Sequence, residues 1–322
     1  MEALYMVAGI VLGIVLLAVI VFSALSVVLI LRSFTREKDR ETSVKKYLAF
    51  LREKGQGDVA ERIAEARRAF FEAEKETISI TTRDGWKVSG YLLSSPEDVN
   101  NTAVLVHGYR SFGADDFGAI FSHYREKRWR VLVIDQRTHG QSEGKYICFG
   151  VKERNDLLDW LNYLTERFGC EQKIVLHGIS MGAATIMMAQ ELPQVRNKVS
   201  AVIADCGYVT PGQQFRDMFA SMHLPYFPLF AISRVITRCM CGFDYFGASS
   251  AVGLKNAEAP VLIIHGKKDT FVLPGCSQTN FDACKSEKEL YWVDNAEHAC
   301  SVLVDQPGYF KHIDAFLTKY EL

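Results

Sequence analysis

The first stretch of the chain is continuously apolar. Between Met6 and Leu31 no residue is charged, and the only residues that are not apolar are two glycines and two serines. A helix of this length rises about 39 Å, more than the roughly 30 Å hydrocarbon core of a bilayer. The run exceeds the roughly 7–15 apolar residues of a cleaved signal peptide, and the only charge before it is Glu2, not a basic residue. The pattern predicts a transmembrane anchor over residues 1–31, in contact with the lipid bilayer through residues 6–31.

Basic side chains follow this run directly, interleaved with three acids. They are Arg32, Arg36, Lys38, Arg40, Lys45 and Lys46. The positive-inside rule counts basic residues near a membrane and gives little weight to acids. We therefore expect a single-pass membrane protein with a short outer tail and the rest of the chain in the cytoplasm.

Residues 32–76 form a basic flank and a connector. Within residues 41–76, Val59, Ile63 and Phe70 recur at helical spacing among Glu and Arg residues. We expect a solvated helical spacer with one face resting on the domain that follows. The period then changes to two over 77–83, Asp84-Gly85 supplies a turn, and 86–93 returns as a second strand.

From residue 102 the chain alternates between short apolar runs and helical segments. Runs typical of buried strands occur at 103–106, 131–134, 174–176, 199–204, 261–264 and 290–293, and helical segments at 117–127, 152–168, 183–192 and 309–320. Short buried strands alternating with helices predict an α/β fold with a mostly parallel sheet and helices on both faces. Functional residues in such sheets gather at the carboxyl ends of the strands.

The segment 211–256 is too long for a simple crossover between two of these strands. It is rich in Phe, Met, Tyr and Leu, and prolines interrupt its helical pattern. Two interpretations are open: a small helical cap over the strand ends that faces an apolar ligand, or an ordinary packed helix pair. If it is a cap, Phe215 and Phe219 are the side chains expected against the substrate.

Composition narrows the function further. The 322 residues carry 37 basic and 38 acidic side chains, a net charge of −1, which argues against a nucleic-acid binder. The eight cysteines have neither the spacing of a disulfide framework nor that of a zinc site, so we expect buried free thiols. No phosphate-binding glycine motif and no cluster of metal ligands occurs, so no cofactor and no metal are expected. The oligomeric state is not determined by these features.

The strongest motif is Gly178-Ile179-Ser180-Met181-Gly182, which follows a strand and precedes an apolar helix. In this context G-x-S-x-G is a nucleophile elbow that exposes the serine hydroxyl at a sharp turn. The helix N-terminus behind it favours a developing oxyanion.

A serine nucleophile needs a base and an acid that orients the base. Such elbows use the chain order Ser, Asp or Glu, His. Asp269 follows the run at 261–264 and His298 follows the run at 290–293, so both lie past strand ends in the required order. Asp294 is a rival for the acid. We expect His107, His177 and His265, which each precede glycine at a strand end, to make structural hydrogen bonds.

An oxyanion hole needs two backbone donors. The N–H of Met181, directly after the nucleophile, is one candidate, and the N–H of Tyr109, after the strand at 103–106, is the other. The side chains of Tyr109 and Arg110 either line the substrate pocket or only close the loop.

These segments together resemble the α/β-hydrolase superfamily over roughly residues 77–322, and most closely its esterase, lipase and serine-aminopeptidase branches. The segments are His107–Tyr109, Asp135–Ser142, Gly178–Gly182, Asp269 and His298. The resemblance implies an eight-stranded, mostly parallel sheet and acyl transfer to water through a serine acyl-enzyme. It also implies a structural role for Asp135, Arg137 and His139. The loop at residue 107 lacks the H-G-G-G run of some lipases.

We therefore expect a membrane-anchored serine hydrolase that acts on a small-molecule carboxylic ester with an apolar acyl group. A serine peptidase, amidase or thioesterase with the same triad is the alternative. An aminopeptidase should carry acids near the cap, and only Asp217 and Asp244 lie there. A non-catalytic binding protein on the same scaffold would be expected to have lost a triad member, and all three are present.

Overall fold

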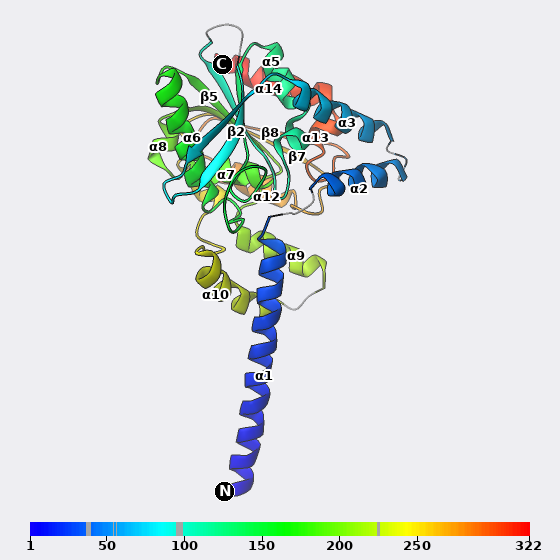
Figure 1. Ribbon diagram of the computed structural model, residues 1–322, viewed down its shortest axis with the longest axis vertical. Helices are drawn as coiled ribbons and strands as arrows, with labels where there is room; N and C mark the ends of the chain where they lie inside the picture. Colours follow the sequence, from blue (N-terminus) through cyan, green and yellow to red (C-terminus); the bar gives the residue numbers. More distant parts are fainter. Residues whose placement is uncertain (37–39, 54, 56, 95–98, 224–225) are drawn as a thin grey trace.

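The computed structural model describes residues 1–36, 40–53, 55, 57–94, 99–223 and 226–322 (Figure 1). Lys38 of the basic flank and the side chain of Arg40 lie outside the described residues. A long helix, α1 (Glu2–Ser33), projects from an α/β domain that contains all the strands of the described chain.

The domain is built on one eight-stranded sheet with the order β1-β2-β4-β3-β5-β6-β7-β8. The strands β1 and β2 pair antiparallel, β2 pairs antiparallel with β4, and all the remaining pairs are parallel. The expected mostly parallel sheet is confirmed. The strands are β1 (Glu76–Thr81), β2 (Lys87–Leu93), β3 (Asn101–Val106), β4 (Arg130–Ile134), β5 (Lys173–Ile179), β6 (Val199–Asp205), β7 (Val261–Gly266) and β8 (Lys288–Val293).

Helices cover both faces of the sheet. In β4, Leu132 and Ile134 face one buried cluster and Val131 and Val133 face the other, because successive side chains of a strand point to opposite faces. The first cluster is covered by α6 (Glu153–Phe168), α7 (Met181–Ala189), α8 (Pro193–Arg196), α11 (Ser250–Lys255) and α12 (Gly275–Ala283). The second is covered by α4 (Gly113–Phe117), α5 (Ile120–Glu126), α13 (Ser301–Val304) and α14 (Gln306–Lys319).

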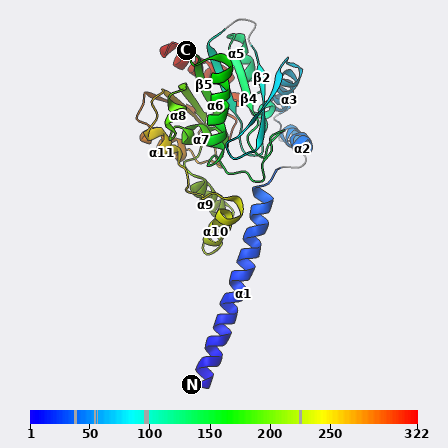
Figure 2. The same ribbon diagram turned by 60° about the vertical axis from the view of Figure 1, so that its left-hand side comes forward.

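The insertion between β6 and β7 divides into two parts. Its helix α11 packs on α7 as an ordinary layer of the domain. The other two helices, α9 (Pro211–Ser221) and α10 (Leu229–Cys241), lie below the strand ends beside the upper part of α1 in both views (Figures 1 and 2). They are the part of this segment that forms a cap.

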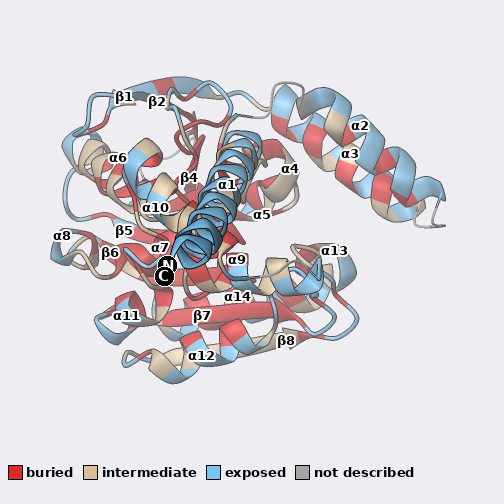
Figure 3. Ribbon diagram, turned by 90° about the horizontal axis from the view of Figure 1, so that it is seen from below, coloured by how far each residue is buried: buried red, intermediate tan, exposed pale blue. Residues whose placement is uncertain are grey.

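Most of α1 is exposed (Figure 3). Its length and apolar composition are sufficient to cross a membrane. Only its C-terminal part packs on other elements, chiefly on α10, and there Ser26 and Ile30 are buried.

The connector is a helix pair rather than a spacer. Helices α2 (Arg40–Glu53) and α3 (Gly57–Glu72) pack on each other through Val44, Leu48 and Ile63. Phe70 at the end of α3 is fully buried in the core beside the sheet, and Arg67 forms an ion pair with Asp115 of α4. The connector therefore contributes to the domain core, which the amphipathic pattern alone did not indicate.

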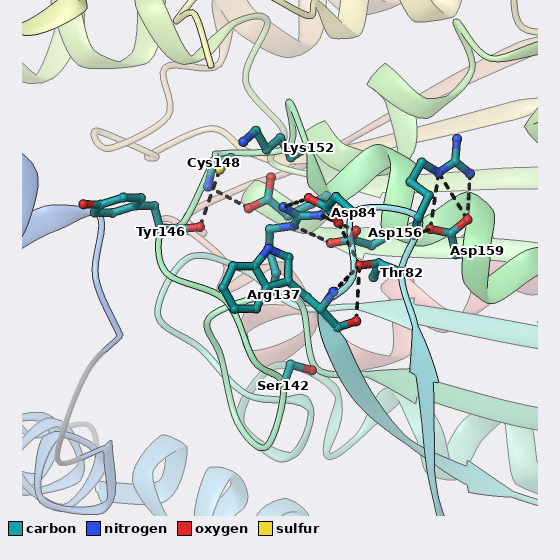
Figure 4. A network of polar contacts seen from close by, with 12 residues as sticks. Thr82, Asp84, Arg137, Ser142, Tyr146, Cys148, Lys152, Asp156 and Asp159 are labelled. Atoms are coloured by element: carbon teal, nitrogen blue, oxygen red, sulfur yellow. Dashed lines mark hydrogen bonds and ion pairs between the residues drawn. The ribbon is translucent and has the colours of Figure 1, made fainter. Parts of the chain in front are cut away.

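A buried ion pair ties the loop after β4 to α6 (Figure 4). The Arg137 guanidinium donates to both carboxylate oxygens of Asp156 at 2.5 and 2.6 Å, and to Asp84 of the β1–β2 turn at 3.0 and 3.1 Å. Arg137 and Asp156 are almost fully buried, whereas Asp84 is well exposed. Arg137 therefore holds three segments together: the loop after β4, helix α6 and the β1–β2 turn.

We predict that Arg137→Met lowers the free energy of unfolding by about 3–5 kcal/mol, because it leaves the buried Asp156 carboxylate unpaired. The matched variant Asp84→Asn removes the exposed partner and should cost at most about 1 kcal/mol. Urea denaturation of the full chain in detergent, followed by tryptophan fluorescence, measures both. Equal losses in the two variants would contradict this assignment.

Candidate active site

Ser180 occupies a strained turn between β5 and α7. Its backbone has φ +55° and ψ −116°, an unfavourable conformation for a residue with a side chain. Glycines make the turn possible: a Cβ on Gly182 would lie 1.7 Å from the Val106 carbonyl oxygen, and one on Gly178 would lie 2.5 Å from Gly182. The small residues of the motif are thus required by backbone-to-backbone contact.

The structure brings the three predicted side chains into one hydrogen-bonded chain. Ser180 Oγ lies 2.8 Å from His298 Nε2, and His298 Nδ1 lies 2.7 Å from Asp269 Oδ2. Asp269 follows β7 and His298 follows β8, so the two neighbouring strand ends deliver the acid and the base to the elbow. With Nδ1 donating to the carboxylate, Nε2 is the nitrogen available to take the serine proton.

Asp269 is held as a carboxylate by several donors. Its Oδ1 accepts hydrogen bonds from the N–H groups of Phe271 and Val272 at 2.9 Å, and its Oδ2 is shared by His298 and His265. Burial opposes ionisation, but the hydrogen bonds from the two imidazoles outweigh it and lower the pKa of Asp269 to about 2. His265 therefore supports the acid, a contact more specific than the structural hydrogen bond expected from the sequence.

The loop after β3 lies against the nucleophile. A Cβ on Gly108 would come within 3.3 Å of Ser180 Cβ, so residue 109 follows directly beside the serine. Asp116 of α4 accepts the Gly108 N–H at 2.6 Å, and His139 Nε2 accepts the Arg110 N–H at 3.0 Å. Sequence reasoning missed Asp116, because nothing in its spacing marks a residue that holds a loop eight positions away.

Two cavities meet at Ser180. One, of about 290 Å³, is almost wholly apolar and lies between the C-terminal end of α1, the two cap helices and the elbow. The predicted Phe215 and Phe219 line it, as does Tyr109. The other, of about 240 Å³, lies between α2, α3 and α13 and is also lined by Tyr109 and His298.

Arg110 lines neither of these cavities within the described residues. Its guanidinium donates to the carbonyl oxygens of Arg32 and Thr35, so it closes the end of α1 instead. The rival acid Asp294 is on the surface, paired with Lys267 at 2.8 Å. The eight cysteines are free thiols, and Cys206 lies close enough to Asp269 and His298 for their ligand atoms to fall within 4.8 Å of one another. Burial raises the pKa of the Cys206 thiol well above its usual range, which disfavours the thiolate that a metal would need.

His107 and His177 make buried hydrogen bonds away from the reacting atoms. His107 Nε2 accepts from the Gln136 N–H, and His177 contacts the hydroxyls of Tyr124 and Tyr309. Burial lowers the pKa of His177 to about 3, so this imidazole is neutral.

A further buried acid, Asp205, ends β6 beside the site. Its Oδ1 accepts from Ser301 Oγ at 2.9 Å, and its backbone oxygen accepts the Ser180 N–H at 2.8 Å. Burial raises the pKa of Asp205 to about 6. The folded protein therefore binds this proton more tightly than the unfolded chain, whose aspartates titrate near 3.9.

We predict that Asp205→Asn stabilises the protein more at pH 8 than at pH 4.5. A raised carboxyl pKa costs stability increasingly as pH rises from about 4 to about 6, and the neutral amide removes that cost. The difference between the two pH values should reach about 2 kcal/mol. Thermal unfolding of variant and wild type at both pH values measures it; a pH-independent difference would contradict the assignment.

Comparisons with known proteins support the α/β-hydrolase fold. A family model described as the alpha/beta hydrolase fold matches residues 102–234. The protein YqkD of Bacillus subtilis is 28% identical over 276 residues, which cover 84% of this chain and 89% of that protein. The membrane protein YNL320W of Saccharomyces cerevisiae is 24% identical over 248 residues, which cover 75% of this chain and 79% of that protein. The solved structure of the esterase Pf2001 of Pyrococcus furiosus is similar with a TM-score of 0.62 at 22% identity, covering 78% of this chain and 94% of the esterase.

Proposed function

We propose that this chain, which has the α/β-hydrolase fold, is a serine hydrolase that cleaves carboxylic esters with apolar acyl groups. The observation that carries the proposal is the hydrogen-bonded chain Ser180–His298–Asp269 at the mouth of an apolar cavity. An acyl group in that cavity would place its carbonyl carbon next to Ser180 Oγ.

The reaction follows from these positions. Ser180 Oγ attacks the ester carbonyl carbon while His298 Nε2 takes the serine proton, and Asp269 stabilises the imidazolium that forms. The N–H groups of Met181 and Tyr109 would hold the oxyanion. His298 then gives its proton to the leaving alkoxide, and an alcohol departs from the acyl-enzyme. A water molecule, deprotonated by His298, attacks the acyl-enzyme and releases the acid while Ser180 recovers its proton.

The acids near the cap do not favour an aminopeptidase. Asp244 is paired with Arg234 at 2.9 Å and with Arg238 at 3.3 Å, and neither it nor Asp217 is among the described residues that line the two cavities at Ser180. No described acid lines the apolar cavity. The second cavity is lined by Asp115 and Asp116, but Asp115 forms an ion pair with Arg67 and Asp116 accepts hydrogen bonds from the Gly108 N–H and the Ser111 hydroxyl. Amide and thioester substrates share the mechanism and belong in the substrate panel.

We predict that a fluorophosphonate probe labels the wild-type protein and that Ser180→Ala abolishes this labelling. The same variant should lower ester hydrolysis by about 10⁴-fold or more, because the nucleophile is removed. The matched variant Ser221→Ala, on the exposed end of α9, should be labelled as the wild type is. Labelling that persists in Ser180→Ala would overturn the nucleophile assignment.

We also propose that α1 anchors the protein in a membrane with the catalytic domain in the cytoplasm. The basic residues after α1 favour this orientation. The name of the yeast relative, a membrane protein, supports the anchor but not its direction.

The exposed Cys170 provides the test of orientation. A membrane-impermeant maleimide should not label it in intact cells and should label it after permeabilisation, with Cys170→Ser as the control for this site. A cysteine introduced as Glu2→Cys, at the other end of α1, should be labelled in intact cells. The opposite pattern would reverse the orientation.

A further inference from the structure

The end of α1 is built into the substrate site. The Phe34 ring packs on the rings of Phe149, Phe215 and Tyr245, with centroids 4.9, 5.6 and 6.3 Å away. The Tyr109 hydroxyl donates to the Ser33 carbonyl at 2.6 Å, and the Arg36 guanidinium donates to the carbonyls of Gly140 and Ser142. These contacts fix the apolar helix relative to Ser180.

The same helix forms one wall of the apolar cavity. Leu29, Ile30 and Phe34 line it from α1, and Met218 and Met222 line it from the cap. Met222 is 60% exposed, and Leu29 and Met218 are partly exposed. The cavity thus extends from Ser180 to the surface where α1 and the cap lie side by side.

This surface lies at the depth of the hydrocarbon. The apolar run of α1 rises about 39 Å, and about 30 Å of it is needed to span the bilayer, which leaves about 9 Å outside. Apart from the partly buried Ala18, the buried and partly buried residues of α1 recur from Phe22 through Ser26 to Ile30, close to the end of the run, over about 15 Å of helix. Because 15 Å exceeds 9 Å, part of the cap lies beside membrane-embedded turns of α1.

The outer surface of the cap fits such a position. From Met218 to Ser233, 16 residues, the sequence has no Asp, Glu, Lys or Arg. Phe227 is 77% exposed, and the neighbouring Tyr226 and Met222 are also exposed. Exposed apolar residues of this kind mark a lipid or protein contact, and amphipathic cap helices immersed by about 5–10 Å are typical of the membrane interface. Because the exposed apolar surface of the cap continues the apolar surface of α1, we infer a contact with lipid rather than with another protein.

We propose that the substrate is an acyl lipid resident in the same bilayer, and that its acyl chain enters laterally between α1 and the α9–α10 cap. This inference rests on the proposed serine hydrolase function and on the proposed membrane anchor. The lipid ester would rise along α1 until its carbonyl meets Ser180, and its chain would remain in the apolar cavity that α1, α9 and α10 enclose. The substrate need not cross water to reach the site.

The test compares two esters on the full chain reconstituted in phosphatidylcholine vesicles. Methylumbelliferyl acetate is presented from water, and methylumbelliferyl oleate from the bilayer. Leu29→Trp narrows the lateral entry and should lower the oleate-to-acetate rate ratio at least tenfold. Val28→Trp adds the same side chain at a neighbouring position of α1. Val28 is 57% exposed, so this variant should leave the oleate-to-acetate rate ratio within about twofold of the wild type.

A second measurement reports immersion of the cap without using activity. Phe227→Trp should add fluorescence that brominated lipids quench. Val252→Trp, at a 42% exposed position on α11 away from the cap, should add fluorescence that they do not quench.

The outcomes separate the two proposals. Ser180-dependent acetate hydrolysis, with an unchanged ratio in Leu29→Trp or without quenching at position 227, overturns lateral entry and leaves the hydrolase. Absence of Ser180-dependent hydrolysis of both esters in the wild type overturns the proposed function, and lateral entry with it.

Discussion

Backbone contact between Gly182 and the end of β3 controls the geometry of the candidate active site. Only hydrogen fits between Gly182 Cα and the Val106 carbonyl, so α7 begins directly against the neighbouring strand. This close approach forces Ser180 into its positive-φ turn and brings the loop after β3 alongside it. The strain costs about 1–3 kcal/mol, and the buried layers on both faces of the sheet support it. The positions of Ser180 and of the proposed oxyanion donors therefore depend on this contact between α7 and β3, and His298 meets Ser180 at the same edge of the sheet.

A second set of contacts holds the end of α1, and Tyr109 connects these contacts to the loop beside Ser180. Tyr109 directly follows Gly108, which lies against Ser180, while its hydroxyl donates to the last turn of α1 and its ring stacks on Phe149 at 5.3 Å. A displacement of α1 would therefore move a residue next to the nucleophile. The proposed anchor helix thus also forms part of the wall of the apolar cavity beside Ser180.

The short apolar runs along the sequence were sufficient to predict the sheet and the strand ends at which the site residues lie. The β-branched runs identify six of the strands, and each of Ser180, Asp269 and His298 follows one of them, so a parallel sheet places all three at the same edge. Contacts between residues far apart in the sequence could not be predicted from the spacing of apolar residues. Apolar spacing places Phe70 on a helix face but does not say that the face enters the domain core. Likewise, no local signal links Phe34 to Phe215, and the spacing of His265 does not reveal that it shares the carboxylate of Asp269.

Because the chain is synthesised from its N-terminus, Phe34 exists before the aromatic rings on which it packs. Its ring partner Tyr245 leaves the ribosome about 210 residues after Phe34. At roughly 5–20 residues per second, α1 exists for about 10–40 s before the cap has been synthesised. During that interval the face of α1 that carries Ser26 and Ile30 has no cap helix packed on it. Docking of the cap on α1 therefore follows the synthesis of Cys241, the last residue of α10, and any factor that holds nascent α1 in place acts before the pocket is complete.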